Sequence, residues 1–154
     1  YGAGMQIALA ADFRFATPDC ELSIMEAKWG LVPDMSGTVS LRELVPIDIA
    51  KRLSMTAECF SAEQGKAWGL VTETYEQPLL AARELAASIA TRSPDSVAST
   101  KFLFQRAWPA SENHAFWLER WYQLRLLFGK NQRVAVKTVQ TGKAQPYLPR
   151  RVKS

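Results

Sequence analysis

The spacing of apolar residues in the first part of the chain predicts one buried helix followed by short strands. Residues 5–11 are small and apolar and follow two glycines, which is typical of a buried helix entered from a tight turn. Residues 12–16 alternate and carry aromatic side chains, so they predict a strand, and residues 21–24 predict a second one. We expect residues 25–31 to be extended or irregular, before a loop at residues 32–37 that contains Pro, Asp and Gly.

The rest of the chain has mostly helical spacing. Ser61 and Gln64 have the spacing of a capping box, and Ser93 followed by Pro94 marks another helix start. This order, a few strands and then helices, predicts an α/β (or α+β) fold. A brief strand is expected at residues 70–74, and the expected helices cover residues 38–45, 47–57, 61–67, 78–91, 93–107 and 111–128.

The helix at residues 111–128 carries a stripe of large apolar side chains on one face. Trp117, Trp121, Leu124 and Phe128 fall at helical spacing. Three interpretations stay open: the stripe is core, it lines a ligand site, or it lies in a subunit interface, where Trp and Tyr are enriched.

Composition narrows the class of protein. With 47% hydrophobic and 22% charged residues among 154, the chain is that of a globular domain or a piece of a larger one. Its uncharged apolar runs reach only about eight residues, too few to span a membrane. Cys20 and Cys59 are too few for a disulfide framework or a four-cysteine zinc site, which favours a reducing, cytoplasmic compartment. Because His114 is the only histidine, metal sites built on paired histidines are excluded.

The two ends of the chain carry further signals. The chain opens at Tyr1 directly into a glycine-rich apolar turn, so we interpret it as the C-terminal portion of a longer protein. Residues 130–154 contain seven basic residues and no acid, within a net charge of +4 for the whole chain. Such a basic segment could contact the phosphates of a nucleotide-like ligand, an anionic surface or nucleic acid, or it could be a solvated terminus. No basic motif interleaved with aromatics supports nucleic acid specifically.

Two features could carry chemistry. Gly2-Ala3-Gly4 opens a helix, where backbone N–H groups are unpaired and can hold an anion or a developing oxyanion. Glu26 lies in an apolar stretch, and burial would raise its pKa and make it a usable proton shuttle. The alternatives for Glu26 are an ion pair with Lys28 or a plain solvent-facing side chain.

These segments together resemble the crotonase superfamily, that is, the enoyl-CoA hydratase/isomerase family. The resemblance extends over the whole chain. It rests on residues 2–16, Leu22-Ser23-Ile24-Met25-Glu26, Gly30-Leu31-Val32-Pro33-Asp34, Gly37-Thr38, Leu53-Ser54-Met55-Thr56 and Phe60 to Val71. It implies that residues 1–75 form the C-terminal part of a ββα spiral core and that residues 76–154 form a helical, oligomerising region. It also implies homotrimers or hexamers.

The resemblance also implies site residues. The backbone N–H of an oxyanion hole aligns with Ala3, in the turn that includes Gly2 and Gly4. The first catalytic carboxylate of hydratases aligns with Gln6, which can hydrogen-bond a water molecule but cannot take its proton. The second catalytic carboxylate aligns with Glu26.

Asp34 has a possible role as well. An acidic residue at this distance after Glu26 is similar to one found in dienoyl-CoA isomerases of the family. The alternative is that Asp34 is a helix N-cap or turn residue ahead of Ser36.

The resemblance implies an acyl-CoA enzyme with Glu26 as acid and base, which isomerises or hydrates enoyl-CoA. Coenzyme A is then part of the substrate, and no other cofactor, metal, nucleic acid or membrane partner is expected. The alternative is a non-catalytic crotonase-fold protein that binds acyl-CoA or only assembles. Because the first oxyanion donor and much of the CoA pocket would lie upstream, we expect the 154 residues alone to be inactive.

Overall fold

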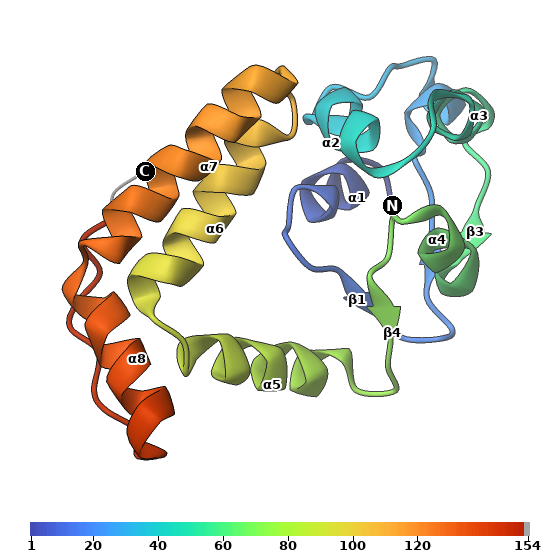
Figure 1. The fold of residues 1–154 in the computed structure, drawn as a ribbon. Helices are drawn as coiled ribbons and strands as arrows, with labels where there is room; N and C mark the ends of the chain where they lie inside the picture. The colour runs from blue at the N-terminus through green and yellow to red at the C-terminus, as the bar shows by residue number, and fades with distance from the viewer. Residues whose placement is uncertain (153–154) are drawn as a thin grey trace. The chain divides into compact units, whose positions relative to one another are not determined.

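The first helix begins at the glycines, as expected. In the computed structural model of the protein, which describes residues 1–152, α1 spans Gly2–Leu9 (Figure 1). Met5, Gln6 and Leu9 are buried, whereas Ile7 is 58% exposed. The helix therefore buries one face rather than its whole surface, and a polar side chain, Gln6, is part of the buried face.

In residues 1–152, four short strands form two separate pairs. β1 (Phe15–Ala16) pairs in parallel with β4 (Glu73–Thr74). β2 (Glu21–Leu22) pairs antiparallel with β3 (Phe60–Ser61), which was not expected. The predicted strands at residues 12–16, 21–24 and 70–74 are thus each shorter than the alternation suggested.

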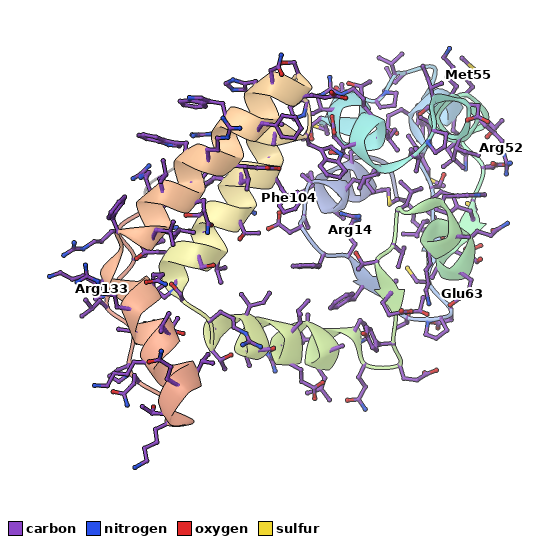
Figure 2. The ribbon with its side chains drawn as sticks, viewed as in Figure 1. Arg14, Arg52, Met55, Glu63, Phe104 and Arg133 are labelled. Atoms are coloured by element: carbon purple, nitrogen blue, oxygen red, sulfur yellow. The ribbon has the colours of Figure 1, made fainter. Side chains whose placement is uncertain are left out.

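Arg14 ties the approach to β1 to the segment that leads into β4. Its Nε donates to Leu70 O over 2.7 Å, and its Nη1 donates to Ala11 O over 2.6 Å. The Arg14 backbone also exchanges hydrogen bonds with Thr72. Burial lowers the pKa of the Arg14 guanidinium, an effect that the charge of Asp12 partly offsets. Figure 2 labels Arg14 near α1 and β1.

The expectation of extended or irregular chain at residues 25–31 is wrong for residues 26–29. Glu26–Trp29 forms a 3₁₀-helix, η1, which ends at Gly30 with a left-handed φ of 71°. A loop then leads to α2 (Gly37–Leu44), and Ser36 directly before it also has a positive φ of 64°. Local hydrogen bonds of the 3₁₀ type are poorly signalled by apolar spacing, which is why the helix was missed.

The remaining helices of the first part follow the prediction closely. α3 spans Ile47–Thr56 and α4 spans Ala62–Trp68. The capping box at α4 is confirmed, because Ser61 Oγ accepts from Gln64 N and Gln64 Oε1 accepts from Ser61 N. A single core joins α1, α2, α3 and β3, and Trp68 of α4 packs against it; its buried residues are Met5, Leu9, Ile24, Leu41, Val45, Leu53, Phe60 and Leu70.

The chain forms two units, Tyr1–Glu84 and Leu85–Ser154. The division falls inside α5 (Pro78–Ala90), whereas the sequence placed a boundary at residue 75. The assignment of residues 1–75 to a spiral core and of residues 76–154 to an oligomerising region stays a prediction.

The second unit is helical. α6 (Pro94–Ala107) has Ser93 as its N-cap, which accepts from Ser96 N, and α7 (Glu112–Leu127) runs antiparallel beside it (Figure 1). A further helix, α8 (Lys130–Thr141), occupies the first 12 residues of the basic segment. The basic residues of this helix, Lys130, Arg133 and Lys137, are exposed, so the interpretations of the segment as solvated and as anion-binding both stay open.

The apolar stripe of α7 is exposed. Trp117 is 55% exposed and Trp121 is 44% exposed, whereas Leu118 and Tyr122 of the same helix are buried. The interpretation of the stripe as core is therefore wrong for this chain. None of the described helices is long and apolar enough to cross a membrane.

Candidate active site

Glu26 is buried and is hydrogen-bonded to Gln6. Only 8% of Glu26 is exposed, and Gln6 is not exposed at all. Gln6 Nε2 donates to Glu26 Oε1 over 2.5 Å, which links the buried face of α1 to the first residue of η1. The alternatives of an ion pair with Lys28 and of a solvent-facing carboxylate are therefore wrong.

The other end of the Gln6 amide is held by the backbone. Gln6 Oε1 accepts from Met35 N over 3.0 Å and from Gly37 N over 3.1 Å. Because two N–H donors occupy the carbonyl side, the NH₂ group must face the carboxylate. The loop before α2 thus fixes the orientation of Gln6, and Gln6 fixes that of Glu26.

Glu26 Oε2 has no hydrogen-bond partner among the residues that the structure describes, although it is buried. A buried polar atom of a carboxylate normally has a partner, because leaving it without one costs about 1–3 kcal/mol or more. An unsatisfied buried oxygen beside a fully bonded one marks Glu26 Oε2 as a candidate to contact a ligand.

The glycine-rich turn lies against this carboxylate. A Cβ added to Gly2 would sit 3.5 Å from Glu26 Oε1, and Gly2 adopts a positive φ of 54°. Gly2 N already donates to Ser23 O over 3.0 Å. Ala3 and Gly4 are exposed and stand in the first turn of α1, where N–H groups lack intrahelical partners, so their N–H groups are the available donors.

Asp34 lies in the same loop but is not joined to the others. It is exposed, and no hydrogen bond or ion pair links its carboxylate to Glu26 or Gln6 in the part of the chain that the structure describes. The N-cap of α2 is Ser36, so the interpretation of Asp34 as a cap is wrong. Asp34 is a loop residue one position before the Met35 N–H that holds Gln6.

Sequence reasoning missed Met35 and Gly37, which contribute backbone N–H groups and no side-chain chemistry. The role of Gly37 becomes visible through the close packing around it in the structure. A Cβ at Gly37 would lie 2.5 Å from Gln6 Oε1 and 3.0 Å from Pro33 Cβ, so this position leaves no room for a side chain. Glycine is therefore required there by close packing rather than by its backbone angles.

The arrangement consists of a buried carboxylate with one unpaired oxygen beside a helix start with unpaired N–H groups. Such a pair can transfer a proton and stabilise a nearby negative charge on oxygen. Chemistry of this class fits enzymes that act on carbonyl compounds through an enolate.

Comparison with known proteins identifies the class. The family model for enoyl-CoA hydratase/isomerase matches residues 1–133, and the chain belongs to this family. The resemblance expected over the whole chain is thus shown for residues 1–133. The chain is 36% identical over 107 residues to carnitinyl-CoA dehydratases from Salmonella paratyphi A and Salmonella typhi, an alignment that covers 68% of this chain and 41% of each relative.

Solved structures confirm the α/β fold of the crotonase type. An enoyl-CoA hydratase from Polaromonas sp. JS666 matches with a TM-score of 0.88 and 28% identity, over 96% of this chain and 58% of that one. A probable enoyl-CoA hydratase/isomerase from Mycobacterium abscessus matches with a TM-score of 0.91 and 28% identity, over 97% and 62% of the two chains. The chain therefore spans less than two thirds of the proteins it resembles.

Proposed function

We propose that the chain carries the acid/base part of an active site that processes acyl-CoA thioesters. Glu26 moves the proton at the carbon next to the thioester, and the Ala3 N–H donates to the thioester oxygen. Family membership supports the substrate class, and the local geometry supports the two roles.

The observation that carries this proposal is the state of the two Glu26 oxygens. Oε1 is occupied by Gln6, whereas Oε2 is buried without a partner among the described residues. A carboxylate held at one oxygen keeps its orientation while the other exchanges a proton with substrate. A merely structural carboxylate would have both oxygens bonded.

The role of the oxyanion donor falls to Ala3 because the Gly2 N–H is already bonded to Ser23 O. Removal of a proton next to a thioester leaves negative charge on the thioester oxygen. A backbone N–H aimed at that oxygen stabilises the enolate, and one such donor contributes about 10²–10³ in rate.

Gln6 acts as a positioning residue in this proposal. Its amide is buried and holds Glu26 on one side and the Met35 and Gly37 N–H groups on the other. From the sequence, Gln6 could hydrogen-bond a water molecule without taking its proton. The bonded state of its amide instead supports a role in orienting Glu26.

The reaction that we propose is reversible hydration of an enoyl thioester. In the dehydrating direction, Glu26 Oε2 takes the α-proton and the electron pair of that C–H bond moves towards the thioester oxygen. The bond from the β-carbon to its hydroxyl then breaks, the double bond forms, and the same carboxyl returns its proton to the hydroxyl, which leaves as water. The similarity to carnitinyl-CoA dehydratases and to an enoyl-CoA hydratase supports this class of chemistry.

A second candidate is migration of the double bond. It is favoured by the presence of Gln6 where a second carboxylate would assist the attack of water, because one carboxylate suffices to move a proton between two carbons. Asp34 would take part only after a loop movement that brings it to substrate.

Glu26→Gln in the full-length protein tests the proposal. Gln can still accept from Gln6 Nε2, so the fold should be kept and the thermal midpoint should stay near that of the wild type. The rate of hydration or isomerisation should fall by about 10²–10⁴. The measurement is the loss or gain of enoyl-thioester absorbance with a panel of acyl-CoAs, and rates within a few-fold of wild type would refute the role of Glu26.

A further inference from the structure

Ser36 has a backbone conformation that serine seldom adopts. Its φ is 64° and its ψ is 9°, which is the left-handed region. Among residues 1–152, the non-glycine residues with a positive φ are Ser36 and Ala57. Such conformations are uncommon outside glycine, and they persist only where the surrounding structure enforces them. The strained turn at Ser36 therefore calls for a contact that depends on it.

The hydroxyl of Ser36 does not cap the helix that it precedes. Ser36 is the N-cap of α2, and an N-cap serine usually has an extended backbone and accepts a hydrogen bond from one of the first N–H groups of its helix. Here the side chain makes no capping bond, and Ser36 Oγ donates to Met35 O over 2.5 Å. The hydroxyl thus braces the turn itself.

This turn directs two backbone N–H groups at one atom. Met35 N and Gly37 N, on either side of Ser36, donate to Gln6 Oε1 over 3.0 and 3.1 Å. Successive N–H groups around a left-handed residue in a turn form a concave site, called a nest, that holds an oxygen atom. Gln6 Oε1 occupies this nest. An extended Ser36 would turn the two N–H groups apart, so the contact with Gln6 depends on the left-handed φ.

The nest reaches the carboxylate through the other end of the same amide. Gln6 Nε2 donates to Glu26 Oε1, and both side chains are buried. Ser36 is exposed and binds neither of them with its own side chain. The order of contacts therefore runs from an exposed serine, through two backbone N–H groups and a buried amide, to the carboxylate.

We propose that Ser36 is a positioning residue for the acid/base chemistry of Glu26. Its left-handed conformation keeps the N–H groups of Met35 and Gly37 on Gln6. Gln6 in turn keeps Glu26 Oε2 directed at substrate. This inference rests on the function proposed above. Because Ser36 acts on the residue that moves the proton and not on substrate binding, its loss should lower kcat and leave KM near that of the wild type.

Ser36→Val in the full-length protein tests the proposal. A β-branched side chain strongly disfavours a positive φ, so the turn should leave its left-handed conformation. We expect kcat for enoyl-thioester turnover to fall about 10–10²-fold, with KM within a few-fold of wild type. Ser36→Thr keeps the hydroxyl and adds only the branch, so it should lower kcat in the same direction even if the Val variant does not fold. Ser36→Gly adopts the conformation without strain and should keep kcat within a few-fold.

Ala57→Val is the matched control. Ala57 has a φ of 52° at the C-terminal end of α3, so the same side chain meets the same kind of backbone there. Its backbone bonds go to Leu53 O and Ser23 Oγ rather than to Gln6. The control and Ser36→Val should lower the urea midpoint by similar amounts, and only Ser36→Val should lower kcat. An equal loss of kcat in the control would assign the effect to general destabilisation and overturn the proposal.

Two further measurements show whether Ser36 acts through Gln6. In a Gln6→Ala background, Ser36→Val should have little further effect on kcat, because the contact that it supports is already absent. Amide hydrogen exchange at Met35 and Gly37 should become faster in Ser36→Val and stay slow in Ala57→Val. Fully additive losses of kcat, or unchanged exchange at both amides, would overturn the proposal.

The exchange measurement also separates this inference from the function on which it rests, because it reports the bonds to Gln6 without any substrate. If Glu26→Gln left turnover unchanged, the proposed function would fail whatever the exchange rates. A large loss in Glu26→Gln together with an unchanged kcat in Ser36→Val would leave the proposed function standing and overturn the role of Ser36 alone.

Discussion

Gln6 donates a 2.5 Å hydrogen bond to Glu26, and the direction of this bond is set by two backbone N–H groups on the opposite side of the Gln6 amide. The Gln6 amide cannot flip without breaking the bonds from Met35 N and Gly37 N. Its neutral NH₂ group therefore stays directed at the Glu26 carboxylate. Gln6 thus holds the Glu26 side chain in its orientation, so substitutions at or beside Gln6 should change the activity or the stability of the protein.

Gln6→Glu should couple two carboxylates. One oxygen of the new side chain would keep the bonds from Met35 N and Gly37 N, so its other oxygen would face Glu26 Oε1. Two carboxylates at hydrogen-bond distance cannot both ionise easily, so the pair should retain one proton to a pH above the ordinary range of Glu. We expect hydration of 2-enoyl-CoA to appear or increase, and the acidic limb of the pH–rate profile of the full-length protein to move to higher pH. An unchanged acidic limb would contradict this geometry.

Gly37→Ala should damage the site without touching a catalytic group. The added methyl would lie 2.5 Å from Gln6 Oε1 and 3.0 Å from Pro33 Cβ, so Gln6 or the loop must move. Overpacking of this kind costs about 1–3 kcal/mol in the free energy of unfolding. Urea unfolding measures the stability loss, and enoyl-thioester kinetics measure the accompanying fall in kcat.

Gly4→Ala is the matched control for that substitution. A Cβ at Gly4 has nothing within 4 Å, and the residue lies in α1. The change should therefore be neutral or stabilise the protein by about 0.5–1 kcal/mol, because alanine restricts the unfolded chain more than glycine does. A loss in the control as large as that of Gly37→Ala would show that steric contact with Gln6 is not the cause.

The sequence predicted the elements that depend on local signals. The start of α4 at Ser61 and of α6 at Ser93 followed from side chains that cap the backbone within three residues. The apolar neighbours of Glu26 made burial one of three open interpretations, and the structure shows that Glu26 is buried. For both helix starts the deciding contacts lie within three residues along the chain.

The parts that were missed depend on contacts between distant segments. The Gln6–Glu26 bond joins residues twenty positions apart, and the Asp95–Val152 bond joins residues fifty-seven positions apart. The helix α8 was also not predicted, and it packs against α6 and α7. Spacing along the chain carries no information about such partners.

The exposed stripe of α7 should mediate self-association of the full-length protein. Trp117 and Trp121 stack with their ring centroids 5.9 Å apart, and the Arg125 guanidinium lies over the Trp121 ring. Large exposed aromatic side chains are typical of interfaces, and the family resemblance implies homotrimers or hexamers. We expect Trp117→Asp to shift the mass measured by light scattering towards the monomer. Lys137→Asp, on an exposed position of α8, is the control and should leave the assembly intact.

Asp95→Asn should remove a pH-dependent part of the stability of the second unit. Burial alone would raise the pKa of the Asp95 carboxyl, but hydrogen bonds from Arg151 N, Asn131 Nδ2 and Val152 N outweigh it, so the pKa lies below its ordinary value. Because the pKa in the folded state is lower than in the unfolded state, the charged Asp95 stabilises the fold fully above its unfolded pKa. This contribution is lost as the pH falls through the folded pKa.

The difference in the free energy of unfolding between wild type and Asp95→Asn should therefore be largest near neutral pH and should shrink towards acidic pH. Urea unfolding at a series of pH values measures it. Asp48→Asn is a suitable control, since Asp48 is exposed in the first turn of α3, and its effect should be small. A difference for Asp95→Asn that grew on acidification would mean that the folded protein holds Asp95 protonated, and the hydrogen bonds to its carboxylate would then not act as described.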